Sequence, residues 1–171
     1  MFKFKPKCVY LTTGTATGSV CRNAFDNALL DAGIANFNLL KITSIIPPGL
    51  QVNRIPNDSR IIKENGLIAP TVYEKVNSEQ VGKEICAAVG SGIPQSNDEV
   101  GVIFVYADEG KQKVADNIVT EMVTEGMEER GCFDYEIKTE AVSVQVTSPC
   151  TSAVAAAVLC NEDIKIAIEQ N

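Results

Sequence analysis

The chain has 171 residues, of which 45% are hydrophobic and 22% charged, values typical of one soluble globular domain with a substantial core. Its net charge of −7 at pH 7 argues against a nucleic-acid or anionic-membrane partner, because no basic face is available. No apolar run approaches the roughly 18 residues that cross a bilayer, and no apolar segment of a signal peptide follows the basic N-terminus. We therefore expect a cytoplasmic domain that binds neither nucleic acid nor membrane.

The first part of the chain predicts a strand, a loop and a helix. Residues 9–13 are apolar and β-branched and predict a short strand. Residues 14–19 are rich in glycine and hydroxyl groups and predict a turn-rich loop. Asn23 suits the N-cap of a helix that continues to about Ala32, and Gly33 stands where such a helix would stop.

A glycine loop before a helix can also bind phosphate through its backbone N–H groups. The phosphate-loop signature requires a lysine after its second glycine, but Ser19 follows Gly18. A turn is therefore favoured, and an α/β nucleotide-binding protein built on this loop is the weaker hypothesis.

Two strands, separated by a long loop, are predicted in the middle of the chain. Residues 37–46 predict a buried strand, and the proline-, asparagine- and arginine-rich residues 47–65 predict a long surface loop. Residues 67–76 predict another strand, with Pro70 at an edge or a bend.

The second half of the chain predicts a sheet and one long helix. Residues 85–89 suit either a helix or a strand, whereas 100–106 predict a buried strand. Within 111–130, Val114, Ile118 and Met122 recur at the four-residue spacing of a helix that stops before Gly131. Further strands are predicted at 141–146 and 154–159, which together indicate a sheet-rich α+β or α/β domain.

The six cysteines are dispersed and form no C-x-x-C pair, and the chain contains no histidine. A zinc site would therefore require several distant cysteines to converge. The pattern favours small buried side chains in a reducing compartment over a metal site or a disulfide. The cysteines are Cys8, Cys21, Cys86, Cys132, Cys150 and Cys160.

Asp26 lies early in the first predicted helix, within the run NAFDNALLDAG. A carboxylate in a first turn stabilises the helix dipole on a solvated face. The functional alternative is that Asp26 binds a cation.

The Thr43–Ser44 bond stands between two apolar runs, and Pro47 and Pro48 follow shortly after. Without histidine, the serine lacks the usual imidazole base. Its hydroxyl can instead attack the preceding carbonyl, and elimination from the resulting ester leaves a pyruvoyl group, the kind of electron sink that decarboxylation needs. Taken alone, the segment is more typical of a buried strand that ends in a proline turn.

Asn38 precedes this bond on the same predicted strand. Alternation along a strand places Asn38, Ile42 and Ser44 on one side. The Asn38 amide could then polarise the Thr43 carbonyl as an oxyanion donor during attack by Ser44.

The runs NAFDNALLDAG, NFNLLKITSIIPPG and NGLIAP, in this order and spacing, closely resemble the pyruvoyl-dependent arginine decarboxylases. The resemblance covers nearly the whole chain, as far as the alanine-rich residues 153–159. It implies an α+β fold, the αββα sandwich of the pyruvoyl-dependent arginine/histidine decarboxylase type. It also implies a single proenzyme domain, 1–171, that cleaves itself into 1–43 and 44–171 and assembles as a homotrimer with active sites between subunits.

The resemblance also implies roles for single residues. Cleavage would fall after Thr43, and Ser44 would become the covalent pyruvoyl cofactor. Asn38 matches an asparagine implicated in processing, and Asp26 matches the acidic residue that recognises the guanidinium of arginine, a charge-assisted pairing. The implied reaction converts arginine, a small basic amino acid, to agmatine and carbon dioxide without a metal.

Val105 departs from the family pattern. The family carries a glutamate directly before the tyrosine of the strand predicted at 100–106, and valine cannot donate the proton that decarboxylation requires. In one hypothesis the acid comes from elsewhere, such as Tyr106, Asp108, Glu109 or a neighbouring subunit. In the alternative, the chain is a catalytically impaired or inactive paralogue that assembles and binds a cationic ligand.

Overall fold

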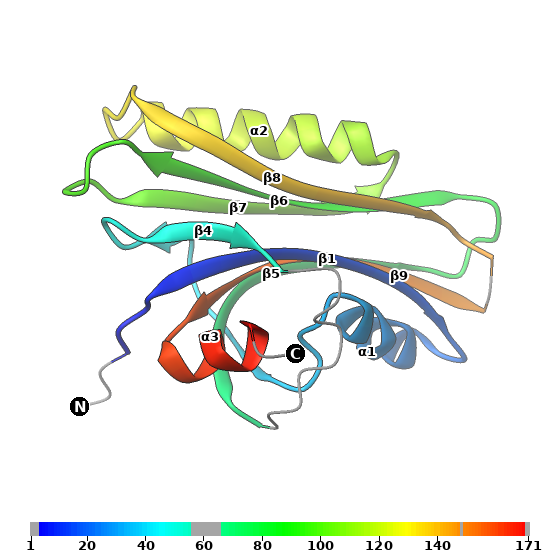
Figure 1. The fold of residues 1–171 in the computed structure, drawn as a ribbon. Coiled ribbons are helices and arrows are strands. Elements are labelled where there is room, and N and C mark those ends of the chain that lie inside the picture. Colours follow the sequence, from blue (N-terminus) through cyan, green and yellow to red (C-terminus); the bar gives the residue numbers. More distant parts are fainter. Residues whose placement is uncertain (1–3, 56–65, 148, 170–171) are drawn as a thin grey trace.

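The computed structural model describes residues 4–55, 66–147 and 149–169. Two stacked sheets lie between helices, with α2 over the outer face of one sheet and α1 and α3 over the outer face of the other (Figure 1). The chain therefore forms the αββα sandwich that the resemblance implies. The elements are β1 (Cys8–Gly18), α1 (Cys21–Asp31), β2 (Asn38–Lys41), β3 (Ile45–Ile46), β4 (Gln51–Arg54), β5 (Ile68–Ser78), β6 (Glu84–Pro94), β7 (Gly101–Glu109), α2 (Gln112–Glu128), β8 (Tyr135–Gln145), β9 (Cys150–Cys160) and α3 (Glu162–Glu169).

Sheet A contains its strands in the order β2-β5-β9-β1-β4, and sheet B in the order β3-β7-β6-β8. In sheet A, β9 is antiparallel to β1 and β5, whereas β2 and β4 are parallel edge strands. Sheet B is antiparallel throughout. Strands β2 and β3 are consecutive along the chain, but one is an edge of sheet A and the other an edge of sheet B. The residues between them therefore cross from one sheet to the other.

One large hydrophobic core lies between the two sheets, and another lies between sheet A and helices α1 and α3. All 11 residues of β9 are buried, because one face of this strand contacts sheet B and the other contacts α1 and α3. The inward alanines of β9 leave room for larger side chains such as Leu11 of β1 and Ile103 of β7. Burial of this apolar surface is the main force that holds the two sheets together.

Strand β1 continues through the segment that was predicted to be a glycine loop. Helix α1 packs so closely on β1 that a Cβ atom on Gly14 would lie 2.2 Å from the Ala28 carbonyl oxygen, and one on Gly18 would lie 2.3 Å from the Ala24 nitrogen. The glycines therefore permit close helix–sheet packing, and the loop required for a phosphate site does not form.

Two further expectations are wrong, one about the start of the first helix and one about the strand predicted at 37–46. Val20, not Asn23, is the N-cap of α1, so that Asn23 lies inside the helix. The strand predicted at 37–46 is two strands in different sheets, because the chain leaves sheet A after Lys41 and enters sheet B at Ile45.

Strand β4 forms inside the loop predicted at 47–65, of which residues 56–65 lie outside the described residues. The strand predicted at 67–76 is confirmed as β5. Pro70 is not on an edge strand, but pairing of β5 with β9 begins only at Thr71, so β9 requires no N–H from the proline. Residues 85–89 belong to strand β6, and β7 and α2 are confirmed.

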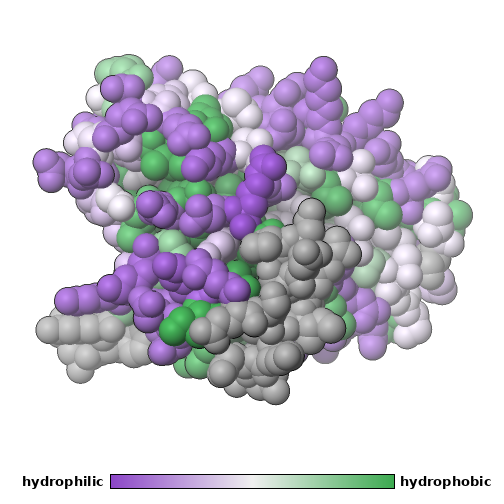
Figure 2. Space-filling model, in the orientation of Figure 1, coloured by the Kyte–Doolittle hydropathy of each residue, from purple (hydrophilic) through white to green (hydrophobic). Residues whose placement is uncertain are grey.

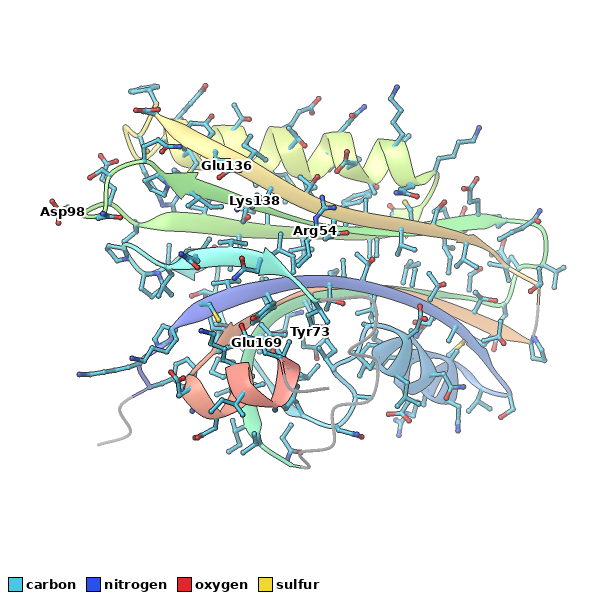
Figure 3. All side chains as sticks on the ribbon, viewed as in Figure 1. Arg54, Tyr73, Asp98, Glu136, Lys138 and Glu169 are labelled. Atoms are coloured by element: carbon cyan, nitrogen blue, oxygen red, sulfur yellow. A yellow bond between two sulfur atoms is a disulfide. The ribbon has the colours of Figure 1, made fainter. Side chains whose placement is uncertain are left out.

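Helix α3 was not predicted, and it packs on the outer face of sheet A. The Tyr10 hydroxyl of β1 donates a hydrogen bond to the Glu169 carboxylate at the end of α3, and Glu169 is labelled in Figure 3. Burial raises the pKa of Tyr10 well above its usual value. This contact joins the C-terminal helix to a central strand.

The visible surface in Figure 2 is mostly hydrophilic, with hydrophobic side chains between the polar ones. Among the described helices, none is both long enough and apolar enough to span a membrane.

Candidate active site

The Thr43–Ser44 bond lies where the chain crosses from sheet A to sheet B. The Ile42 N–H donates a hydrogen bond of 3.1 Å to the Thr71 carbonyl of β5, and the Ser44 carbonyl accepts one of 2.8 Å from the Ile103 N–H of β7. Each sheet therefore holds one side of the bond. Thr43 is exposed and Ser44 is half-buried, so the bond is fixed at both sides and lies near solvent.

The Ser44 hydroxyl has no hydrogen-bond partner among the residues that the structure describes. The Ser44 hydroxyl therefore makes no structural contact in the described part of the chain. The Thr71 hydroxyl, in contrast, donates a hydrogen bond to the Ala69 carbonyl. The Ser44 hydroxyl is thus available to attack the Thr43 carbonyl, while the hydrogen bonds of Ile42 and of the Ser44 carbonyl hold the backbone on both sides.

Asn38 begins β2 and is used to position the neighbouring segment. Its side-chain amide donates to the Gly66 carbonyl at 2.9 Å, and its backbone N–H donates to the Leu67 carbonyl at 2.9 Å. Because β2 ends at Lys41, the alternation of faces does not extend from Asn38 to Ser44. The expected common face of these two residues therefore does not follow from the structure.

Val105 lies on the face of β7 that points into the core between the sheets, together with Ile103. The Ile103 N–H binds the Ser44 carbonyl, and two residues along a strand span about 7 Å. Position 105 is therefore beside the Thr43–Ser44 segment, where the family resemblance expects a glutamate.

The alternative acids of β7 lie elsewhere. Tyr106 packs beneath α2 on the other face of sheet B, and its hydroxyl is 3.5 Å from Asp108 Oδ2. Burial, aided by the Asp108 charge, raises the pKa of Tyr106. Glu109 binds Lys83 Nζ at 2.7 Å at the far end of the strand. Within one protomer, none of the three replaces a side chain at Val105.

Asp26 is exposed on α1, whose Ala24 and Ala28 are buried. It lies beyond the first turn, which contains no acidic residue, so the expected first-turn stabilisation does not apply. Within the described ranges, no hydrogen bond or ion pair connects Asp26 with Thr43 or Ser44.

Helix α1 nevertheless contacts the strand that leads to the Thr43–Ser44 bond. Phe25, beside Asp26, stacks on Tyr73 of β5 with 6.2 Å between ring centroids. Lys41 Nζ, at the end of β2, lies 4.9 Å from the centroid of the same Tyr73 ring. Tyr73 is labelled in Figure 3 below the sheets. The ring therefore links the helix of Asp26 to the last residue of β2.

Glu74 of β5 is not among the site residues predicted from the sequence. Its Oε2 atom lies 3.5 Å from Lys41 Nζ, and its strand neighbours Val72 and Val76 face the core between the sheets. Because side chains alternate along a strand, Glu74 shares their face. The signal was present in the sequence as a charged residue at an apolar position of the strand.

A disulfide between Cys21 and Cys150 overturns the expectation that all six cysteines are free. Their Cα atoms are 5.2 Å apart and their positions are 129 residues apart in the sequence. Pairing of β1 with β9 places Gly18 opposite Cys150, which brings Cys150 to the start of α1. The other four cysteines are free and buried, as predicted.

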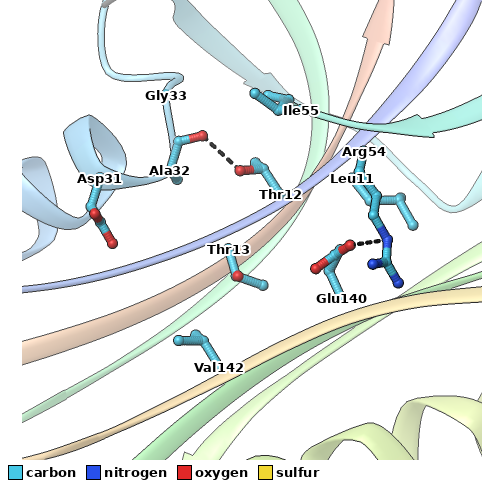
Figure 4. A pocket seen from close by; sticks show the side chains of 10 residues that line it. All are labelled: Leu11, Thr12, Thr13, Asp31, Ala32, Gly33, Arg54, Ile55, Glu140 and Val142. Carbon is cyan, nitrogen blue, oxygen red and sulfur yellow. Dashed lines mark hydrogen bonds and ion pairs between the residues drawn. The ribbon is translucent and has the colours of Figure 1, made fainter. Parts of the chain in front are cut away.

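A cleft of about 480 Å³ lies at the opposite edge of the sandwich, between β1, β4, β8 and the end of α1 (Figure 4). Arg54 of β4 and Glu140 of β8 form an ion pair across it. Burial raises the pKa of Glu140, and the Arg54 charge offsets only part of this effect. Because β4 and β8 are the edges opposite β2 and β3, this cleft is separate from the Thr43–Ser44 bond.

Comparison with known proteins identifies a matching family. A family model described as pyruvoyl-dependent arginine decarboxylase matches residues 8–164. The chain is 37% identical over 155 residues to the pyruvoyl-dependent arginine decarboxylase of Pyrococcus horikoshii, covering 90% of this chain and 95% of that protein. It is 36% identical over 143 residues to the protein of the same name from Methanocaldococcus jannaschii, covering 83% and 82% of the two chains.

Proposed function

The chain belongs to the family of pyruvoyl-dependent arginine decarboxylases, and we propose that it cleaves its own Thr43–Ser44 bond and then converts arginine to agmatine and carbon dioxide. Family membership supports a decarboxylase with a covalent pyruvoyl group. The cleavage position, the product and the roles of single residues are the proposal.

The observation that carries the proposal is the double attachment of the Thr43–Ser44 bond. One sheet binds Ile42 and the other binds Ser44, so that attack by the serine occurs within a fixed backbone frame. Such fixed geometry lowers the entropic cost of an intramolecular reaction. The half-buried position also allows water to reach residue 44 for the later hydrolysis.

In the proposed cleavage, Ser44 Oγ attacks the Thr43 carbonyl carbon, and the peptide nitrogen leaves as an amine to give an ester. Elimination then removes the Cα proton of residue 44 to a base, breaks the Cβ–Oγ bond and releases Thr43 as a carboxylate, which leaves a Cα=Cβ double bond. The unsaturated residue 44 takes up water and loses ammonia, which leaves a pyruvoyl group. The products are fragments 1–43 and 44–171.

Asn38 is proposed to assist cleavage by donating a hydrogen bond to the oxygen that becomes negative on Thr43. In the uncleaved chain its amide binds the Gly66 carbonyl. The role therefore requires Asn38 to exchange that partner during cleavage.

The pyruvoyl group, once formed, supplies the electron sink for decarboxylation. Asp26 is proposed to bind the substrate guanidinium, because a carboxylate accepts two parallel hydrogen bonds from this planar cation. The proposed assembly is a homotrimer with active sites between subunits, in which the exposed Asp26 of one protomer serves the site of another. We also propose a cytoplasmic location. The Cys21–Cys150 disulfide would be unusual there, because disulfides are uncommon in the cytoplasm of most organisms.

The valine at position 105 supports a second candidate function. In this alternative, the chain assembles and binds a cationic ligand but does not turn it over efficiently. Release of labelled carbon dioxide from arginine by the purified protein distinguishes the two candidates. Turnover supports the decarboxylase. Binding of arginine by cleaved protein without release of carbon dioxide supports the impaired paralogue.

A further inference from the structure

We propose that Glu74 of β5 donates the proton that a glutamate at position 105 of β7 would otherwise donate. The inference rests on the proposed function, which it deepens by assigning the acid of the reaction. It places the acid on the opposite sheet of the same protomer.

Glu74 and Val105 face the same space between the sheets. Val105 packs in the core between the sheets with Ile103. Glu74 pairs in register with Ala155 of β9, which belongs to the same core. Strands β5 and β7 pack against each other, and packed sheets are separated by about 10 Å. A glutamate on either strand therefore enters the same gap.

The two residues also lie at the same height in the sandwich. Strand β5 ends at Ser78, and a connection of five residues leads to Glu84 at the start of β6, whereas β7 ends at Glu109, which pairs with Ile85 near the start of β6. Glu74 lies four residues before Ser78, and Val105 lies four residues before Glu109. Equal rise along the two strands therefore brings them opposite each other.

The Thr43–Ser44 segment is bound to both strands close to this level. Ile42 binds Thr71, three residues before Glu74, and Ser44 binds Ile103, two residues before Val105. The gap that Glu74 enters is thus next to the bond that would yield the pyruvoyl group.

The Glu74 side chain is partly open to solvent and has apolar neighbours. Its side chain is 44% exposed, so solvent can protonate it again after each reaction. The neighbouring strands present Ala155 and Val105, which are apolar, and Lys41 is the charged side chain that contacts the Glu74 carboxylate within the described residues. Arginine binding beside Lys41 would compete with this ion pair, because both are cations.

The proposed step is a proton transfer. The bond between the α-carbon and the carboxylate carbon of arginine breaks, and carbon dioxide leaves. A proton from the Glu74 carboxyl group forms the new C–H bond at the α-carbon. Water then returns a proton to the Glu74 carboxylate, so that one proton is consumed for each carbon dioxide released.

The test compares wild type, Glu74→Gln, Val105→Glu and the double variant. Glu74→Gln should cleave fully but lose about 100-fold or more in kcat, the usual contribution of a general acid. The double variant should recover at least tenfold, because it returns the carboxyl group from β7. Val105→Glu alone should give no gain, because it places two carboxylates in one gap. Glu121→Gln, exposed on α2, is the matched control.

A second measurement reports where the proton goes. Without its acid, protonation falls on the carbon of residue 44 instead of the substrate α-carbon. The substrate amine then stays on residue 44, which becomes alanine, and hydrolysis releases the decarboxylated substrate as a guanidino aldehyde. Mass spectrometry of fragment 44–171 after incubation with arginine should detect alanine in Glu74→Gln. If Glu74→Gln has the turnover of wild type and keeps its pyruvoyl terminus, Glu74 is not the acid, but the proposed function still stands. A cleaved wild type that turns over only after Val105→Glu also overturns the assignment of Glu74. An uncleaved wild-type chain overturns the proposed function as well.

Discussion

Cys21 and Cys150 form a disulfide that connects one residue on each side of the Thr43–Ser44 bond. Cys21 begins α1 and belongs to fragment 1–43, whereas Cys150 begins β9 and belongs to fragment 44–171. The proposed fragments would therefore remain covalently joined after self-cleavage. The disulfide also fixes α1, which carries Asp26, to the central strand of sheet A.

Electrophoresis with and without reductant tests this connection. Denatured but unreduced protein should give one band near 18.4 kDa, and reduction should separate the fragments of 43 and 128 residues that the proposed cleavage site defines in a chain of 171 residues. A Cys21→Ser and Cys150→Ser double variant should separate without reductant. Separation of unreduced wild-type protein into two bands would contradict the disulfide.

Ser44→Ala should abolish cleavage, because alanine has no oxygen to attack the Thr43 carbonyl. The variant should fold, since no hydrogen bond among the described residues depends on the Ser44 hydroxyl. Reducing electrophoresis should then show one intact chain. Ser19→Ala, at an exposed position, should cleave as wild type does. Two fragments from Ser44→Ala would show that another residue is the nucleophile.

Asp26→Asn should raise KM for arginine by about 10- to 100-fold, because a hydrogen bond to a charged group contributes about 1.5–3 kcal/mol. Self-cleavage should be unchanged, since Asp26 has no contact with the Thr43–Ser44 bond. Steady-state release of labelled carbon dioxide measures the change, with Asp98→Asn in the exposed β6–β7 connection as the control (Figure 3). An unchanged KM would remove Asp26 from the binding site.

Gly14→Ala should destabilise the fold by about 1–3 kcal/mol, the usual cost of inserting a methyl group into a packed interface. The new Cβ would meet the Ala28 carbonyl oxygen of α1 at 2.2 Å, and backbone atoms cannot rotate away. Urea unfolding of an uncleavable Ser44→Ala background provides the measurement. Thr15→Ala, on the other face of β1, is the control and should cost less.

Glu140→Gln should stabilise the protein at neutral pH but not at pH 4. Burial raises the pKa of Glu140 above its ordinary value of 4.5, so the folded state favours the protonated form. This favourable contribution is complete below the unfolded pKa and is lost as pH rises through the folded pKa. Glutamine cannot ionise and avoids the loss.

Thermal unfolding between pH 4 and pH 7.5 measures this effect. The melting temperature of Glu140→Gln should exceed that of wild type increasingly as pH rises. Glu136→Gln, exposed on the same strand, controls for the removal of one negative charge from an acidic protein. Equal changes in both variants would contradict a special effect of burial at Glu140.

The sequence predicts most of the strands and the long helix because these elements have strong local signals, whereas the αββα sandwich is what the family resemblance implies. The four-residue spacing of Val114, Ile118 and Met122 corresponds to α2, and the apolar run around Ile103 corresponds to β7. Local pattern fails where tertiary packing decides. Gly14 and Gly18 indicate a turn by composition, yet they lie in β1 because α1 approaches it closely.

The site shows the same division. Thr43, Ser44, Asn38 and Asp26 are recognisable from family spacing, but their positions relative to each other depend on the crossing between two sheets. The Cys21–Cys150 pairing depends on the β1–β9 register, which no spacing along the chain reveals.

The mass of the reduced protein tests the central claim most directly. Self-cleavage at Thr43–Ser44 predicts two species, one ending at Thr43 and one whose blocked N-terminus is a pyruvoyl group at position 44. Both should be present in protein purified without added substrate. A single intact chain of 18.4 kDa after reduction, with serine still at position 44, would contradict the account.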